Sequence, residues 1–212
     1  MPFNIKKLKS WEVLLRRTEP ILFDNFTSYQ DGSGWITKHG VITSGVNNGK
    51  QSLKLLSMGQ RGAIQTTTDL PADFQLDASI MSSTSRFIFT WAVSDITSWN
   101  TMPVIDQPDK FWHAYYSSGR ELSIHGNNTL NIFSETYMSN SAGFDAATSI
   151  DWTTWHTITI SDKSDVITIS VDGSQILQHS VVSSRSGGRL CIESDWTENS
   201  YVCLSDIKVT SL

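Results

Sequence analysis

A two-residue alternation of apolar and polar side chains is the feature of this sequence that most constrains its fold. It is clearest in two neighbouring runs, 154–161 and 165–172. Their apolar residues stand at every second position, namely Ile158 and Ile160 in the first run and Ile167, Ile169 and Val171 in the second. Successive side chains of a β-strand point to opposite faces, so each run buries one side and exposes the other. The pattern predicts an antiparallel hairpin, with a second turn at Asp172-Gly173.

Similar short runs, separated by Gly, Asn, Asp and Ser clusters, fill the chain from residue 19 onward. We predict strands near 20–26, 34–37, 40–43, 51–57, 62–68, 73–81, 86–93, 111–117, 121–125, 129–134, 154–161, 165–172, 175–179, 188–194 and 201–210. The run Arg86–Val93 is apolar on both faces, which is typical of a central strand. One-sided burial in the other strands requires two sheets packed face to face.

Composition agrees with this fold. Ser and Thr account for 52 of the 212 residues, and charged residues for only 17%, a profile of polar strands rather than charged helices. A chain of this length buries a core of its own. We therefore predict an all-β chain, a two-sheet antiparallel jelly-roll sandwich with a short N-terminal helix. Residues 1–18 form a basic amphipathic segment and residues 19–212 a single β-sandwich domain.

The predicted helix spans residues 4–16 and ends before Pro20. Its apolar residues recur at steps of three and four, as Ile5, Leu8, Trp11, Leu14 and Leu15. Three roles stay open for it: docking onto the sandwich or a neighbouring subunit, contact with a membrane surface, or a disordered arm. No signal peptide is predicted, because Glu12 interrupts the apolar run and Arg16-Arg17 closes it.

Charge is unevenly distributed along the chain. Residues 1–17 hold five cations and one acid, a net +4, which leaves −9 for residues 18–212 out of the total of −5. An acidic body repels phosphate backbones, so nucleic acid is not an expected partner, whereas neutral ligands such as sugars are not excluded. No apolar run approaches the ~20 residues that a membrane span needs.

The two cysteines, Cys191 and Cys203, flank a polar stretch and fall in what reads as one hairpin. We expect them to be near neighbours on paired antiparallel strands. Both a disulfide and a pair of buried free thiols are compatible with that arrangement. The compartment of the protein is therefore left open.

Several short motifs resemble the concanavalin A-like lectin/glucanase family, particularly its laminin-G-like and keto-disaccharide-hydrolase-like branches. The motifs occur in the order Ile21–Phe26, Gly34-Trp35, Ser52–Leu55, Leu70–Leu76, Trp155-His156, Val171-Asp172-Gly173, Gly187–Leu190 and Ser205–Val209. The resemblance covers residues 20–210 and implies fold more than activity. Galactose-binding-like modules share the early motifs, but the late Val-Asp-Gly and Gly-Gly-Arg-Leu elements fit the concanavalin-like pattern better.

Relatives of this fold often bind calcium structurally, which points to Asp24 and to Asp31-Gly32-Ser33. Neither loop supplies a full set of oxygen ligands. No other cofactor or metal site is expected, because no two of the five histidines stand at ligand spacing. His156 shares its parity with Ile158 and Ile160, and we expect it to lean into the core.

The stretch Glu193-Ser194-Asp195-Trp196-Thr197-Glu198 spells E-x-D-x-x-E and is similar to the catalytic signature of laminarinase-like glucanases. In those enzymes the alternate carboxylates act as nucleophile, orienting group and acid/base. Here the stretch is polar and stands near the end of the chain. A solvated hairpin tip is therefore the preferred interpretation, and a glycoside hydrolase or lyase using Glu193, Asp195 and Glu198 the alternative.

Aromatic residues provide a better candidate site, because apolar sugar faces stack on Trp and Tyr rings while hydroxyls bind charged and amide groups. The segment 94–110 is longer than structural connections usually need, and an aromatic run follows it directly. The predicted ligand-binding residues are Trp99, Trp112, His113, Tyr115, Trp196, Arg86 and Arg120.

These features predict a non-catalytic carbohydrate-binding or adhesion module whose partner is a glycan or polysaccharide. A phage tail or a cell-surface assembly is the setting we expect, so an extracellular, cell-surface or virion location is favoured. The N-terminal segment is expected to contribute to a homo-oligomer or a larger assembly. A purely structural or oligomerisation domain is the remaining alternative.

Overall fold

The computed structural model describes residues 20–59, 61–84, 87–93, 120–124, 129–133, 144–147, 149–180, 188–195 and 197–212. These residues form strands joined by turns and loops, without a helix. Among them, none is part of a helix long and apolar enough to cross a membrane. The predicted N-terminal helix lies outside the described residues.

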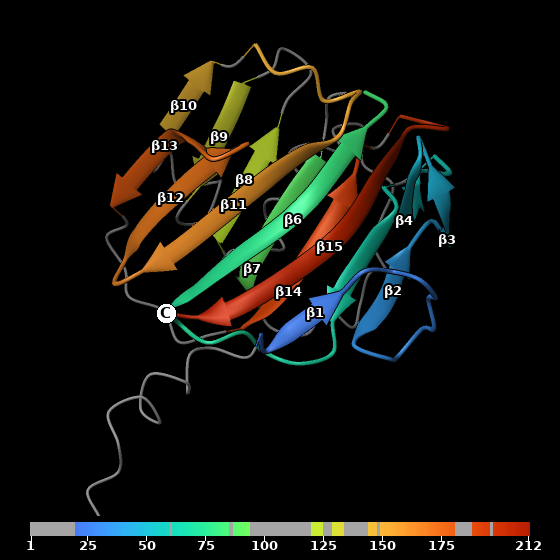
Figure 1. The fold of residues 1–212 in the computed structure, drawn as a ribbon, viewed down its shortest axis with the longest axis horizontal. Helices are drawn as coiled ribbons and strands as arrows, with labels where there is room; N and C mark the ends of the chain where they lie inside the picture. Colours follow the sequence, from blue (N-terminus) through green and yellow to red (C-terminus); the bar gives the residue numbers. More distant parts are fainter. Residues whose placement is uncertain are drawn as a thin grey trace, which may run out of the picture.

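Two antiparallel sheets face each other (Figure 1). The strands of the eight-stranded sheet A are β1 (Leu22–Asp24), β3 (Val41–Asn47), β4 (Lys50–Leu56), β6 (Phe74–Ser82), β11 (His156–Lys163), β12 (Val166–Val171), β13 (Ser174–Ser180) and β15 (Tyr201–Ser211). The strands of the seven-stranded sheet B are β2 (Trp35–His39), β5 (Ala63–Thr66), β7 (Phe87–Val93), β8 (Arg120–Ile124), β9 (Thr129–Phe133), β10 (Phe144–Ala147) and β14 (Arg189–Ser194).

The strand order in sheet A is β13-β12-β11-β6-β15-β4-β3, and β1 pairs with β15 beside this path. Sheet B has the order β10-β9-β8-β7-β14-β5-β2. Consecutive strands thus often lie in different sheets, as a jelly roll requires. The predicted all-β, two-sheet antiparallel sandwich is confirmed, and β7 is a central strand as its two apolar faces indicate.

The predicted hairpin is β11 and β12, with Ile160 opposite Ile169. Its two-residue turn has Ser164 at φ 48° and Asp165 at φ 63°, the left-handed conformation that matches strand twist in mirror-image turns. Strand β11 ends two residues later than expected, so Asp162 belongs to β11 rather than to the turn. Asp172-Gly173 forms the next turn, as predicted.

The core lies between the sheets and is built from the alternating inward side chains. Phe74, Leu76, Ala78 and Ile80 of β6 face Phe87, Phe89 and Trp91 of β7 across it, and all seven are buried. A buried polar contact joins the sheets: the indole N–H of Trp91 donates to the carboxylate of Asp162 at 2.8 Å. Both residues are buried, so this hydrogen bond links β7 of sheet B to β11 of sheet A.

Some elements differ from the prediction. Strand β10 was not expected, and the strand expected at 111–117 lies outside the described residues. Strand β3 extends further than expected, to Asn47, and β4 begins one residue earlier, at Lys50. The two strands meet at Asn48-Gly49, with positive φ at both residues. Asn-Gly is a strong signal for a two-residue hairpin turn. The dipeptide Asn48-Gly49 is therefore the sequence feature that indicates this turn.

The expected pairing of the two cysteine strands is wrong. Strand β14 pairs with β5 and β7 in sheet B, whereas β15 pairs with β4, β6 and β1 in sheet A. Cys191 and Cys203 are buried free thiols that alternate with core residues of their strands, and they therefore point away from each other on opposite outer faces of the sandwich. Packed sheets lie about 10 Å apart, so no disulfide can join them. Residues 195–200 connect two sheets rather than two paired strands.

This arrangement predicts two thiols that do not react in the folded protein. Burial raises the pKa of Cys203 to about 11, which keeps the reactive thiolate scarce at neutral pH. Ellman's reagent at pH 8 should detect no thiol in the native state and two after unfolding, even after air oxidation. Fewer than two thiols in the unfolded, oxidised monomer would contradict the placement of β14 and β15 in different sheets.

Candidate functional site

The outer face of sheet B carries a buried polar row. Leu190 and Ile192 of β14 point into the core, so Cys191 and Glu193 point outward. Glu193 lies between Ala63 and Ile88 in the neighbouring strands, and Cys191 lies between Gln65 and Thr90. The polar members of this row have no exposed surface, and they are Gln65, Thr90, Cys191 and Glu193.

Glu193 forms an ion pair with Arg61, whose Nη1 lies 3.4 Å from Oε2. The side chain of Arg61 is 8% exposed and that of Glu193 is 0% exposed. The thiol of Cys191 lies 3.9 Å from the other carboxylate oxygen. Two charges removed from water are retained only when they are paired. Arg61 and Glu193 therefore form a buried ion pair on the outer side of β14.

A glycine fixes the backbone that carries Arg61. A Cβ at Gly62 would lie 2.8 Å from the carbonyl carbon of Leu55 and 2.9 Å from the amide nitrogen of Leu56, closer than side chains normally approach. The Gly62 N–H also donates to Oγ of Ser194 at 2.8 Å. The segment before β5 is thus held against β4 and β14, which places Arg61 beside Glu193.

The three carboxylates of the E-x-D-x-x-E stretch are separated. Glu193 is inside β14, so its expected position at a solvated hairpin tip is wrong. Asp195 follows the strand, is 5% exposed and accepts a hydrogen bond from the Thr197 hydroxyl at 2.8 Å. Glu198 is exposed in a turn that the Ser200 N–H closes on the Thr197 carbonyl at 3.0 Å. Only this last part of the stretch is the solvated turn that was expected.

The two suggested calcium positions hold carboxylates that close turns. The Asp31 carboxylate accepts hydrogen bonds from the Thr37 N–H and the Tyr29 hydroxyl. The backbone bond from Thr37 is the largest of the causes that hold the pKa of Asp31 below its ordinary value. Asp24 accepts from the Phe26 N–H at 2.7 Å. No group of three or more His, Cys, Asp or Glu within the described ranges could hold a metal ion.

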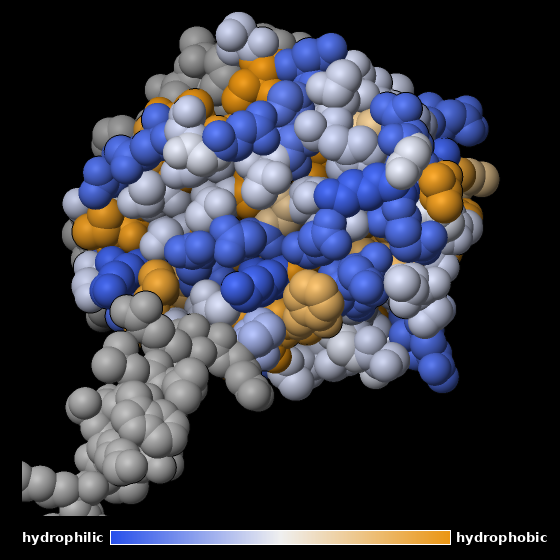
Figure 2. Space-filling view, in the orientation of Figure 1, coloured by the Kyte–Doolittle hydropathy of each residue, from blue (hydrophilic) through white to orange (hydrophobic). Residues whose placement is uncertain are grey.

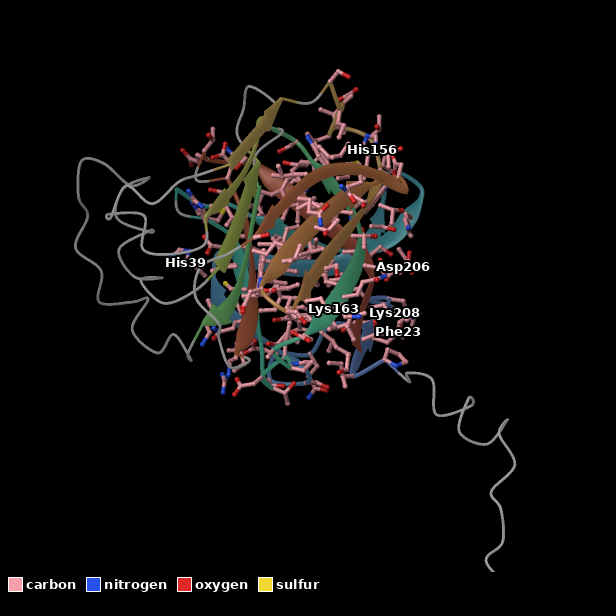
Figure 3. The ribbon with its side chains drawn as sticks, turned by 90° about the vertical axis from the view of Figure 1, so that its left-hand side faces the viewer. Phe23, His39, His156, Lys163, Asp206 and Lys208 are labelled. Carbon is pink, nitrogen blue, oxygen red and sulfur yellow. The ribbon has the colours of Figure 1, made fainter. Side chains whose placement is uncertain are left out.

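His156 lies at the start of β11 and is half-buried rather than part of the core. Its ring packs edge-on against Trp152 at 5.5 Å between centroids. Nδ1 lies 2.7 Å from the Asp172 carboxylate, and Nε2 lies 3.0 Å from the Asp151 carbonyl. Figure 3 shows His156 at one end of the sandwich, far from the labelled Lys163. The contact with Asp172 connects the first residue of β11 to the turn between β12 and β13.

The contact with His156 predicts an acid-sensitive stability. The side-chain hydrogen bond from His156, followed by the backbone bond from Thr157, holds the pKa of Asp172 below its ordinary value of 3.8. A pKa lowered by folding stabilises the protein above pH 3.8, and that stabilisation is lost as the pH falls through the folded-state value. Urea unfolding between pH 6 and pH 2 should show Asp172→Asn less stable than wild type at pH 6. The two curves should converge near pH 2, and a constant gap would contradict the assignment.

Most of the predicted ligand-binding residues lie outside the described residues: Trp99, Trp112, His113, Tyr115, Trp196 and Arg86. Arg120 begins β8, where its backbone lies opposite Trp91 of β7. Strands β7 and β8 are neighbours in sheet B, so the segment 94–119 joins two adjacent strands of the sheet that carries the Arg61–Glu193 pair. Convergence of these side chains on one groove stays a prediction.

Comparison with known protein structures identifies the fold of this chain. No family model matches the sequence, and no curated protein does. A protein with a galectin-like fold from Bacillus subtilis superposes with a TM-score of 0.68 at 10% identity, covering 92% of this chain and 98% of that one. The carbohydrate-binding module CBM66 from Bacillus subtilis superposes with a TM-score of 0.59 at 12% identity, covering 87% and 100%.

A third solved structure is a GH16 protein of Bacteroides ovatus in complex with a G4G4G3G product. Its TM-score is 0.60 at 13% identity, and the match covers 89% of this chain and 99% of that one. All three matches extend over nearly the whole sandwich, and identities this low establish the fold alone. The protein therefore has the concanavalin A-like jelly-roll fold that its sequence motifs resemble.

Proposed function

We propose that this protein is a non-catalytic glycan-binding or adhesion module. The fold is shared with a carbohydrate-binding module and a galectin-like protein, although a fold alone does not determine function. The observation that carries the proposal is where the carboxylates of the E-x-D-x-x-E stretch lie and how exposed each of them is. Glu193 is fully buried against Arg61, and Glu198 lies in an exposed turn. Glu193 and Glu198 therefore do not form two accessible carboxyls that could flank a glycosidic bond, which glycoside hydrolysis requires.

The proposed ligand site is formed by the aromatic residues near the connections of sheet B: Trp99, Trp112, His113, Tyr115 and Trp196, with Arg86 and Arg120 as polar partners. Aromatic rings bind the apolar faces of sugar rings, and the two arginines orient the hydroxyls. A place in a virion or cell-surface assembly is a further part of the proposal.

A glycoside hydrolase using Glu193, Asp195 and Glu198 is the second candidate. It is favoured by the superposition on the GH16 protein and by the shared parity of Glu193 and Asp195, which differ by two positions. For this candidate to hold, the Arg61–Glu193 pair would have to open and Glu198 would have to approach Glu193.

A glycan array followed by product analysis separates the two candidates. The full chain should bind at least one class of glycan on the array, and prolonged incubation with that glycan should release no new reducing ends. Release that Glu193→Gln abolishes would establish the hydrolase instead. Failure to bind any glycan, together with a stable assembly in sedimentation, would favour a purely structural domain.

Loss of a stacking ring should weaken binding without unfolding the protein. Truncation of a Trp at a binding hot spot costs about 2 kcal/mol or more, which lowers affinity roughly thirtyfold. We expect this loss for Trp99→Ala and Trp112→Ala, measured by titration calorimetry with the glycan found on the array. Trp155→Ala, at the residue just before β11 of sheet A, is a control, and its binding should match wild type. Equal binding by all three variants would contradict the proposed site.

A further inference from the structure

Strand β1 presents an exposed apolar patch at the edge of sheet A. Leu22 packs against the core, so the residues on either side of it point outward. Ile21 is 52% exposed and Phe23 is 59% exposed, and Leu212 at the end of the chain is 45% exposed. These three residues are called the β1 patch. The space-filling view shows an apolar area among hydrophilic residues on this side of the molecule (Figure 2), and Figure 3 places Phe23 beside Lys208.

The register of β1 with β15 fixes the size of the patch. Leu22 lies opposite Val209 and Phe23 opposite Lys208, which puts Ile21 opposite Thr210 and Leu212 on the diagonal from Ile21. Residues two apart on a strand are about 7 Å apart, and diagonal neighbours about 7–8 Å. The β1 patch is therefore a stripe about 14 Å long, comparable to two or three turns of a helix.

The stripe lies on a strand that has a neighbour on one side only. Strand β1 pairs with β15 and with no other described strand. Proteins usually protect such edges, and a covering helix or loop is one of the common ways. An exposed apolar stripe beside a sheet edge is thus a surface that another segment can cover.

We propose that the N-terminal segment of the same chain, residues 1–18, docks on the β1 patch. This segment joins the sandwich directly at the patch, because the N–H of Ile21 already bonds to the Val209 carbonyl at 2.8 Å. Its predicted helix presents Leu8, Trp11 and Leu15 on one face. These three residues span about 10 Å along a helix axis, which fits within the stripe.

Charge and chain length favour this occupant. The segment carries +4 and the remainder of the chain −9, so the basic face of the helix is attracted to the body. The four residues between the end of the predicted helix at 16 and Ile21 reach at most about 14 Å when extended. A helix tethered this closely meets its own β1 patch at a high effective concentration, which exceeds that of a second copy in dilute solution.

Hydrogen exchange of the full chain tests the proposal. In wild type, the amides of residues 6–16 should exchange at least about tenfold more slowly than in an isolated peptide, because docking holds the helix. Phe23→Ser and Ile21→Ser should each abolish this protection. Val46→Ser removes another exposed apolar side chain, 72% exposed on β3, and should leave the protection unchanged. Amides of β11 and β12 report whether each variant is still folded.

Hydrogen exchange at two protein concentrations and with lipid vesicles distinguishes the two other possible occupants of the β1 patch, a second copy of the chain and a membrane surface. Protection should be the same at 2 µM and 200 µM protein, roughly a hundredfold range, because an intramolecular contact does not depend on concentration. Protection that increases with concentration, alongside a dimer in sedimentation, would overturn docking within one chain in favour of a second copy. Protection seen only with anionic vesicles would overturn it in favour of a membrane surface. Free exchange in wild type under all conditions would overturn it outright.

Discussion

Replacement of Arg61 by Leu is expected to destabilise the protein by about 3–5 kcal/mol, because it leaves the Glu193 carboxylate buried without its cation. Glu193 has no exposed surface and lies 3.4 Å from the guanidinium. A charge in that position cannot regain water without opening the face of sheet B. Urea unfolding at pH 7, followed by tryptophan fluorescence, measures the loss as a lower midpoint with an unchanged slope.

Two further variants distinguish the effect of burial on stability from the effect of charge pairing. Arg189→Leu removes a more exposed ion pair, in which the partner Asp69 has a 71% exposed side chain, and it should cost only about 0–1 kcal/mol. The double variant Arg61→Leu/Glu193→Leu removes both buried charges and should be more stable than Arg61→Leu alone. Equal losses for Arg61→Leu and Arg189→Leu would contradict the buried position of the pair.

Truncation of Trp91 to Ala should cost about 3–5 kcal/mol, the range for large aromatic residues removed from a packed core. Trp91 is 1% exposed and packs edge-on against Phe74 at 6.3 Å. Its indole also donates to Asp162, so the variant loses both apolar packing and the hydrogen bond that joins the two sheets. Thermal and urea unfolding should both report the loss.

Trp91→Phe isolates the hydrogen bond from the packing. It keeps an aromatic ring in the core but removes the donor to Asp162, and it should cost about 1–3 kcal/mol. Val46→Ala, at an exposed position, should change stability by no more than about 0.5 kcal/mol. If Trp91→Phe were as stable as wild type, the link between β7 and β11 would contribute nothing to stability.

The sequence predicts the strands well because alternation depends on a local property, the burial of one face. Strands β6, β11 and β12 all follow from it. The pairing of strands is a different matter. The stretch between Cys191 and Cys203 has the composition of a hairpin turn, yet it connects two sheets. Alternation indicates which side of a strand is buried but not which strand lies beside it, so a hairpin and a connection between sheets look alike.

The candidate site likewise depends on contacts between distant segments, which the sequence pattern does not show. Glu193 stands out in the sequence as part of an acidic motif, and a polar stretch in that place reads as an exposed turn. Its burial depends on Arg61, which is 132 residues away in the chain and stands alone between Gln60 and Gly62. No local pattern marks such a partner. The tight approach of Gly62 to Leu55 and Leu56 is likewise a contact between segments, which only the folded structure reveals.

Affinity electrophoresis of the native full chain through gels that contain the polysaccharide found on the array tests the central claim most directly. Wild type should be retarded relative to a gel without polysaccharide, Trp112→Ala should migrate almost freely, and the polysaccharide along the wild-type track should keep its full length. Retardation of neither protein, or a wild-type track cleared of polysaccharide, would contradict the assignment of this chain as a non-catalytic glycan-binding module.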